Sequence, residues 1–152
     1  MDVYTFSVAD NTNIWAAVGA QMWAISEKQA ANPSNQGKAR KFQIGSIGLF
    51  YCVEEESLTT PFIVTSAPRF NEQVVNIWKG TWALPFGIHP FGNPNRQLKV
   101  AALAERLPSL RAEKRSWTTL FHVSPMTIFA ASHLTQEDWA LLVQELAVTS
   151  AA

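Results

Sequence analysis

The sequence predicts an α+β domain built on a curled sheet or partly open β-barrel with short helices beside it. Short β-branched and aromatic segments of strand length recur along the chain, separated by turn residues or short helical segments. The 152 residues are typical of one domain, and 47% hydrophobic with 16% charged residues indicate a folded globular chain. We therefore expect a single domain over residues 1–152 with one mixed sheet.

The first part of the chain predicts a strand, a short helix and a second extended segment. Residues 3–8 are β-branched and aromatic, and the polar turn that follows is expected to cap a helix over residues 14–18. Gly19 is the expected end of that helix, so Trp23 in the extended segment 22–25 lies just beyond it. The polar residues 26–41 predict an exposed loop.

The middle and last parts of the chain continue the alternation of strands and helices. A polar loop with three consecutive glutamates, Glu54–Glu56, separates two apolar runs that predict core strands. The final helix begins with a capping box, with Thr135 as N-cap and Asp138 three residues later. The expected elements are strands over 47–53, 61–67 and 83–89, a helix over 97–107, short strands over 117–123 and 126–129, and a helix over 139–147.

Charge and cysteine content restrict the function classes. The chain has 12 basic and 12 acidic side chains, so its net charge gives no general attraction to nucleic acid. The single Cys52 excludes an intrachain disulfide, and no apolar run approaches the roughly 18 residues of a membrane span. No secretory signal is recognisable at the start. We therefore expect a cytoplasmic protein with no membrane partner.

Tryptophans give the first indication of a binding function. Of six tryptophans, Trp23, Trp78 and Trp82 lie beside turns or polar loops. Indole rings can sandwich a planar base, each stack contributing about 1–3 kcal/mol. The base must first leave its own stack, at a cost of a few kcal/mol. The alternative is that all three tryptophans pack in the core, as aromatic side chains usually do.

The segments around these tryptophans resemble YTH domains, which belong to the PUA-like superfamily. Residues 6–14 and 22–26 are similar to the first strand, helix and cage tryptophan of that family, and residues 77–82 to the segment with two further cage residues. Residues 134–139 are more similar to the end of the related EVE domains. The resemblance extends over residues 3–92 and implies a PUA-like fold that reads a modified base.

The resemblance also implies which residues hold the base. Trp23, Trp78 and Trp82 would form the cage, with Asn13 at the base edge. The backbone carbonyl of Ala24 would accept a hydrogen bond from the exocyclic amine. The alternative role for Asn13 is helix capping. N6-methyladenine is the favoured base and 5-methylcytosine the alternative.

The same resemblance suggests a biological setting. A reader without catalytic activity would act through a nuclease or motor on the same or another chain. The PUA-like superfamily suggests the targeting module of a modification-dependent restriction system, which would act on DNA. RNA is the nearest alternative, because YTH domains mainly read RNA.

Phosphate contacts would have to come from local basic residues, since the net charge is balanced. Five of them lie near the expected cage in sequence: Lys28, Lys38, Arg40, Lys41 and Lys79. Arg96 and Lys99 follow shortly after. The alternative is that most of these side chains are ordinary solvated surface.

Two other function classes are open. Three tryptophans can cage a methylated lysine by cation–π attraction, but such a cage usually adds a carboxylate, and only Glu72 lies near Trp78 in sequence. Catalysis has less support. The three histidines are not spaced as a metal site, and Cys52 lies in an apolar strand where an inert thiol is expected. We expect a non-enzymatic domain without cofactor or metal.

Overall fold

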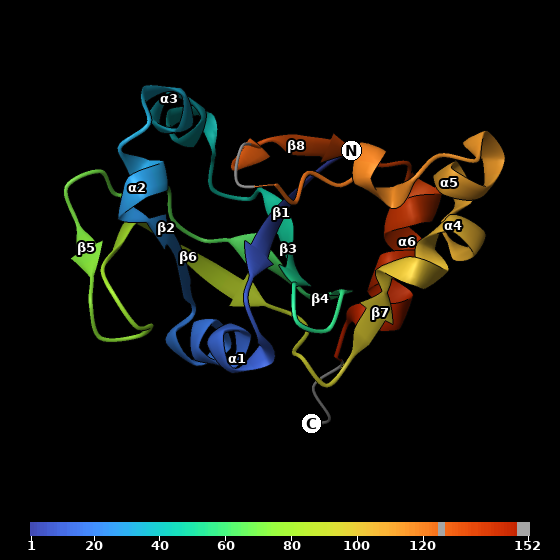
Figure 1. Cartoon of the computed structure of the whole chain (residues 1–152), viewed down its shortest axis with the longest axis horizontal. Helices are drawn as coiled ribbons and strands as arrows, with labels where there is room; N and C mark the ends of the chain where they lie inside the picture. Colours follow the sequence, from blue (N-terminus) through green and yellow to red (C-terminus); the bar gives the residue numbers. More distant parts are fainter. Residues whose placement is uncertain (125–126, 149–152) are drawn as a thin grey trace.

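One curled β-sheet forms the centre of the molecule in the computed structural model, which describes residues 1–124 and 127–148 (Figure 1). Its strands are β1 (Asp2–Val8), β2 (Met22–Ser26), β3 (Ile47–Cys52), β4 (Ser57–Val64), β5 (Gln73–Val74), β6 (Trp82–Pro90), β7 (Gln97–Lys99) and β8 (Ala131–His133). They follow the order β2-β6-β4-β3-β1-β8, with β5 paired to β6 and β7 to β4. β1 and β3 are parallel, whereas the other pairs are antiparallel. The expected α+β fold with a curled sheet is confirmed.

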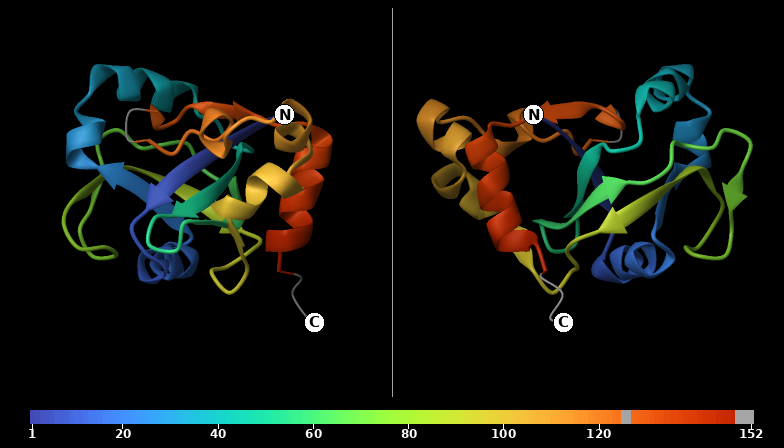
Figure 2. Two further views of the ribbon diagram at one scale, coloured as in Figure 1. Left: turned by 45° about the vertical axis from the view of Figure 1, so that its right-hand side comes forward. Right: turned by 180° about the vertical axis from the view of Figure 1, so that it is seen from behind.

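Short helices surround the sheet. They are α1 (Asn11–Ala20), α2 (Glu27–Ala30), α3 (Pro33–Lys41), α4 (Leu103–Arg106), α5 (Pro108–Glu113) and α6 (Gln136–Leu146), with 3₁₀ turns η1 (Val100–Ala102) and η2 (Trp117–Thr119). α1 and α2 lie at opposite ends of β2, while α4, α5 and α6 gather on the other side of the molecule (Figures 1 and 2). None of the helices among the described residues is long and apolar enough to cross a membrane.

The sheet separates two hydrophobic cores, because its strands bury side chains on both faces. On β1, Phe6 belongs to the inner core and Val3 to the outer core beneath α4–α6. On β3, Phe50 belongs to the inner core and Leu49 to the outer core. Successive strand residues point to opposite faces. Burial on both faces therefore explains why residues 47–53 are almost continuously apolar rather than alternating.

The sheet does not close into a barrel, and the opening lies between β1 and β2. Among the described strands, β2 pairs with β6 alone. β1 pairs with β3 on one side, but on the other side β8 reaches only Asp2–Tyr4. The second half of β1 and the free side of β2 are consequently two open strand edges. We call this opening the seam.

The expected loop over residues 26–41 is wrong, since the structure forms α2 and α3 there. Each helix has a side-chain N-cap: Ser26 Oγ accepts from the backbone N–H of Gln29, and Asn32 Oδ1 from that of Ser34. Pro33 occupies the first turn of α3, where a missing N–H costs nothing. The polar composition of this segment favoured a loop and gave no sign of the two capped helices. The expected stop at Gly19 is also displaced, because α1 ends at Ala20 and Gln21 adopts the left-handed conformation with φ 51°.

Other expected elements differ in the second half of the chain. The helix expected over 97–107 starts as β7, which pairs with β4 before the chain turns into η1 and α4. Residues 117–119 form a 3₁₀ turn rather than a strand, and residues 127–129 are not a strand; residue 126 lies outside the described part. Tertiary pairing and turn hydrogen bonds outweigh local propensity at both places. The final helix is confirmed, with Thr135 and Asp138 forming the capping box.

Candidate functional site

The three tryptophans expected to form a cage meet in the structure. Trp23, on β2, has its ring centroid 4.9 Å from that of Trp78 and 5.9 Å from that of Trp82. Trp78 and Trp82 are 5.8 Å apart, at an interplanar angle of 61°. Trp78 lies in the loop between β5 and β6. The fold therefore brings Trp23 and Trp78, which are 55 positions apart in sequence, into edge-to-face contact.

The three rings differ in exposure. Trp23 and Trp78 are each only 4% exposed and belong to the inner core. The indole N–H of Trp78 is already used, since it donates to the backbone carbonyl of Asn13 at 3.0 Å. Trp82 is half-buried, and its indole N–H donates to the carbonyl of Lys79 at 3.1 Å. The core interpretation therefore describes Trp23 and Trp78, whereas Trp82 retains exposed ring surface.

A cavity of about 120 Å³ lies at the seam, beside this cluster. Its walls come from β1, from β2 with α2, from the start of β6 and from the segment before β8. The lining residues are Thr5, Phe6, Ser7, Trp23, Ala24, Ile25, Gln29, Trp82, His122, Val123, Ser124 and Ile128. Of the five expected base-binding residues, the cavity brings together Trp23, Ala24 and Trp82.

Asn13 and Trp78 do not line this cavity. They are joined to each other by the hydrogen bond from the indole N–H of Trp78 to the backbone carbonyl of Asn13. The capping alternative for Asn13 is wrong, because the N-cap of α1 is Asp10, whose carboxylate accepts from the backbone N–H of Asn13 at 2.9 Å. A side-chain contact between Asn13 and a base stays a prediction.

The cavity runs along two strand edges. Three consecutive residues line it from β1, 5–7, and three from β2, 23–25. Side chains of consecutive strand residues point to opposite faces, so such a run can line one cavity only where the strand's edge is reached. An open edge offers backbone N–H and C=O groups without strand partners. The seam therefore combines aromatic surface with backbone donors and acceptors.

Several cavity residues could not be identified from the sequence. His122, Val123 and Ile128 lie more than a hundred positions from β1, and they reach the cavity because β8 pairs with the start of β1. Ser7 holds that segment in place by donating from Oγ to the carbonyl of Val123 at 2.5 Å. Thr5 is 4% exposed, and its hydroxyl oxygen has no hydrogen-bond partner among the described residues.

The expected phosphate-binding residues lie on α2, on α3 and in the loop before β6. Lys28 is exposed on α2, directly before the cavity residue Gln29. Lys38, Arg40 and Lys41 occupy the last turn of α3, where positive charge also stabilises the helix dipole. Arg40 lies over the ring of Phe70, 4.8 Å from its centroid. Lys79 is exposed in the loop before Trp82. Their role toward phosphate stays a prediction.

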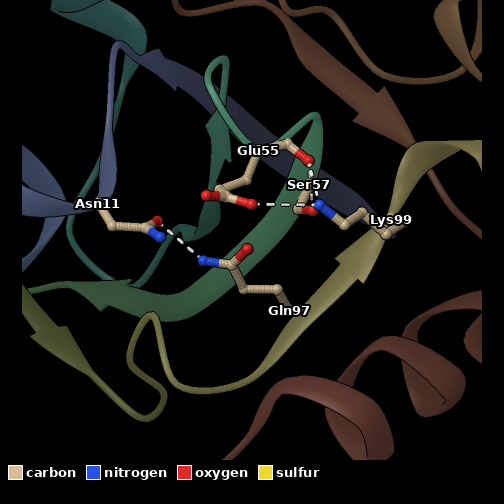
Figure 3. A network of polar contacts seen from close by, with 5 residues as sticks. All are labelled: Asn11, Glu55, Ser57, Gln97 and Lys99. Atoms are coloured by element: carbon tan, nitrogen blue, oxygen red, sulfur yellow. Dashed lines mark hydrogen bonds and ion pairs between the residues drawn. The ribbon is translucent and has the colours of Figure 1, made fainter.

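Two further basic residues are engaged elsewhere. Arg96 donates to three carbonyls at the end of α6, those of Gln144, Glu145 and Ala147. Lys99 lies on β7. Its ammonium group donates to the backbone carbonyl of Glu55 at 2.7 Å and to the side-chain carboxylate of Glu55 at 3.2 Å (Figure 3). These contacts give Arg96 and Lys99 a structural role that the sequence did not show.

The side chains considered for catalysis or metal binding are not arranged for either role in the described part of the chain. Cys52 is fully buried, and burial raises the pKa of its thiol, which disfavours the nucleophilic thiolate. Within residues 1–124 and 127–148 no group of three or more histidine, cysteine, aspartate or glutamate side chains is arranged to hold a metal ion.

The fold is found in solved structures, although the sequence itself matches no family model and no curated protein. The YTH domain of the Zygosaccharomyces rouxii MRB1 protein, in complex with N6-methyladenosine RNA, superimposes with a TM-score of 0.63. It is 12% identical, over 98% of this chain and 89% of that chain. The Mmi1 YTH domain has a TM-score of 0.58 and 14% identity, over 95% of this chain and 94% of its own.

A third structure, protein Atu2648 from Agrobacterium tumefaciens, matches over 98% of this chain and all of its own, with a TM-score of 0.54 and 14% identity. At such identities the likeness concerns the fold. The curled sheet of this chain thus has the fold of known structures. The expected fold is confirmed: this chain has the same fold as YTH domains of known structure.

Proposed function

We propose that this domain binds RNA through one modified base, which leaves its stack and enters the cavity at the seam without being chemically altered. The observation that carries the proposal is the cavity itself, which Trp23 and Trp82 line between two open strand edges. Solved structures of the same fold include Mmi1 and MRB1 YTH domains in complex with RNA, the latter carrying N6-methyladenosine. N6-methyladenine in RNA is therefore the first candidate.

The seam supplies the two kinds of interaction that a base requires. Ring stacking on an exposed indole is sequence-tolerant and contributes about 1–3 kcal/mol. Hydrogen bonds at the base edge provide discrimination, because a partner left unpaired in the wrong complex costs about 1–3 kcal/mol. The half-buried Trp82 would provide the stack, and the buried edge residue Ala24 the carbonyl acceptor.

The volume of the cavity favours a second candidate base. An engineered cavity of roughly 150 Å³ accommodates benzene. At about 120 Å³ this cavity matches a single ring, whereas a purine would fill more than that and extend through the opening. 5-Methylcytosine, a one-ring base with an added methyl group, therefore belongs in the same test.

A methyl-lysine ligand is less well supported by the cavity walls. Cation cages commonly include a carboxylate beside the aromatic rings. No aspartate or glutamate is among the described residues that line the cavity. The DNA-targeting role in a restriction system, with a nuclease or motor partner, remains a prediction from the sequence.

The proposal is tested by titrating the domain with matched oligonucleotides. Single-stranded RNAs of one sequence would carry N6-methyladenine, 5-methylcytosine or no modification, with the DNA counterparts and a trimethyl-lysine peptide alongside. We expect at least tenfold tighter binding of one modified RNA than of the unmodified RNA. Equal affinity for modified and unmodified strands would contradict the proposal, and a preference for the peptide would replace it.

A further inference from the structure

One polar side chain in the wall of the seam cavity has no partner within the described part of the protein. Gln29 is the only residue of α2 that lines the cavity, and it is half-buried there. Its carboxamide makes no hydrogen bond to any described residue. The carboxamide is also not among the unpaired polar atoms that are shielded from solvent. It is therefore accessible to a ligand.

The structure of α2 indicates that Gln29 lines the cavity with its side chain rather than its backbone. Its N–H donates to Ser26 Oγ at 3.2 Å, and its carbonyl accepts from the side-chain amide of Asn35 at 2.9 Å. Glu27 accepts a hydrogen bond from β5, and Ala30 packs against the inner core. Successive side chains of a helix project about 100° apart, so Gln29 points in a third direction.

Helix α3 holds this part of α2 in place. The buried Asn35 donates to the carbonyl of Gln29, and Gln36 donates to the carbonyl of Ala30 at 2.8 Å. The backbone that carries Gln29 is thus fixed from α3, while the side chain is not committed to any described residue. A binding group on a fixed backbone costs less ordering entropy when the ligand arrives.

Other polar groups in the cavity wall are already used. Ser7 donates to the carbonyl of Val123, and the indole N–H of Trp82 donates to the carbonyl of Lys79. The carboxamide of Gln29 offers two donors and one acceptor. Glutamine can form paired hydrogen bonds with the edge of a base, as it does with adenine in nucleic-acid grooves. Its chemistry therefore suits the polar edge of a ring stacked on Trp82.

We propose that Gln29 contacts the inserted base directly, with its carboxamide hydrogen-bonded to the polar edge of the ring. The inference rests on the proposed function of the seam cavity and adds a side-chain contact from α2 to those of Trp82 and Ala24. Both candidate bases carry an exocyclic N–H beside a ring nitrogen, so one carboxamide can serve either. Because no described residue is bonded to the carboxamide, its removal should not destabilise the free protein.

The test compares two substitutions and one resonance. Gln29→Met keeps the length and helix propensity of the side chain and removes its donors and acceptor. Gln144→Met is the control at an exposed glutamine of α6 outside the cavity. We expect Gln29→Met to weaken binding of the preferred modified RNA roughly three- to tenfold. Its melting temperature and its affinity for unmodified RNA should equal those of the wild type, and Gln144→Met should change neither affinity.

The side-chain NH₂ signals of Gln29 provide a second readout in the unaltered protein. They are assigned in the ¹⁵N-labelled domain by their absence from the Gln29→Met spectrum. They should shift when the modified strand is added and stay in place with the unmodified strand. This readout decides the case in which Gln29→Met has a lower melting temperature. A shift would then support the inference, and its absence would overturn it.

The inference and the proposed function can fail separately. If Gln29→Met folds as the wild type does and retains its affinity for the modified strand, the contact is overturned while the proposed function stands. If the wild type shows no preference for any modified strand, the proposed function fails and the contact of Gln29 fails with it.

Discussion

Buried polar groups on the two sides of the central sheet differ in their hydrogen-bond partners. Between α5 and α6, the fully buried carboxylate of Asp138 accepts from Ser109 N–H at 2.9 Å, Ser109 Oγ at 2.5 Å and Thr135 N–H at 3.2 Å. At the seam, the side chain of Thr5 is also buried, and its hydroxyl has no hydrogen-bond partner among the described residues. The first arrangement pairs the oxygens of a buried carboxylate, whereas the second leaves a buried hydroxyl unpaired within the described part of the chain.

The comparison extends to the aromatic residues. Trp78 is enclosed by other rings and bonded to the backbone, while Trp82 faces the cavity with part of its surface exposed. Functional sites often give up local stability in this way, since a fully satisfied pocket has nothing to offer a ligand. Stability and binding should consequently separate by residue, and the following substitutions test that separation.

Trp78→Ala should have the largest effect on stability. Removing a buried tryptophan typically costs about 3–5 kcal/mol, and this one also loses its hydrogen bond to Asn13. Trp82→Ala, at a half-buried site, should cost clearly less and instead reduce binding of modified RNA. Chemical denaturation measures the first effect and oligonucleotide titration the second. Equal losses of stability in both variants would place Trp82 in the core as well.

Asp138→Asn should have the next largest effect, and its size should depend on pH. Burial opposes ionisation of Asp138, but hydrogen bonds from Ser109 and Thr135 outweigh it and hold the pKa of the carboxyl below its ordinary value. The stability it contributes is therefore present above about pH 4 and is lost as the pH falls below that value. Hydrogen bonds to charged groups contribute about 1.5–3 kcal/mol each.

Melting temperatures at pH 7 and pH 3 measure this contribution. The difference between wild type and Asp138→Asn should be large at pH 7 and smaller at pH 3. Glu137→Gln, an exposed neighbour in the same helical turn, is the matched control and should show little difference at either pH. A gap between wild type and Asp138→Asn that does not narrow in acid would mean that the carboxylate charge contributes nothing.

Salt dependence should be modest, because the chain has no net charge. We expect about two to five phosphate contacts, each contributing a slope of roughly 0.7 in a logarithmic plot of affinity against salt on single-stranded RNA. Lys28→Gln should lower the slope by about one contact. Lys99→Gln, which removes a lysine paired with Glu55, should leave it unchanged. A salt dependence as steep as that of strongly basic proteins would mean that more basic side chains contact phosphate than expected.

Asn13→Ala should have the smallest effect on both properties. The cap of α1 belongs to Asp10, and Asn13 contributes its backbone groups to the neighbouring hydrogen bonds, which alanine retains. Because Asn13 does not line the cavity, we expect affinity for modified RNA within about twofold of the wild type. A much larger loss of affinity, with unchanged melting temperature, would support the base contact that the YTH resemblance implies.

The sequence predicted β1, β2, β3, β6, the second half of β4 and the final capped helix, because their signals are local. Short runs of apolar, β-branched and aromatic residues mark β1, β2 and β6, and Thr135 with Asp138 marks the start of α6. Helices α2 and α3 were missed since their caps, Ser26 and Asn32, lie in a polar stretch without an apolar face. Propensity alone does not distinguish such helices from loops.

The site was predictable only in part. Tryptophans beside turns correctly indicated a cluster, and Trp23, Ala24 and Trp82 do share a cavity. The opposite wall depends on pairing between β1 and β8, which no local pattern reports. The unpaired state of the Thr5 hydroxyl is likewise a property of the folded surroundings.

The most direct test of the central claim follows the indole N–H resonances of the ¹⁵N-labelled domain while RNA is added. The inserted base should shift the signals of Trp23 and Trp82, which line the cavity, when the modified strand is added. Trp117 and Trp139, which pack against the outer core, serve as internal controls and should not move. The unmodified strand should leave all four signals in place. Binding of the modified strand without a shift of Trp23 or Trp82 would contradict a base site at the seam.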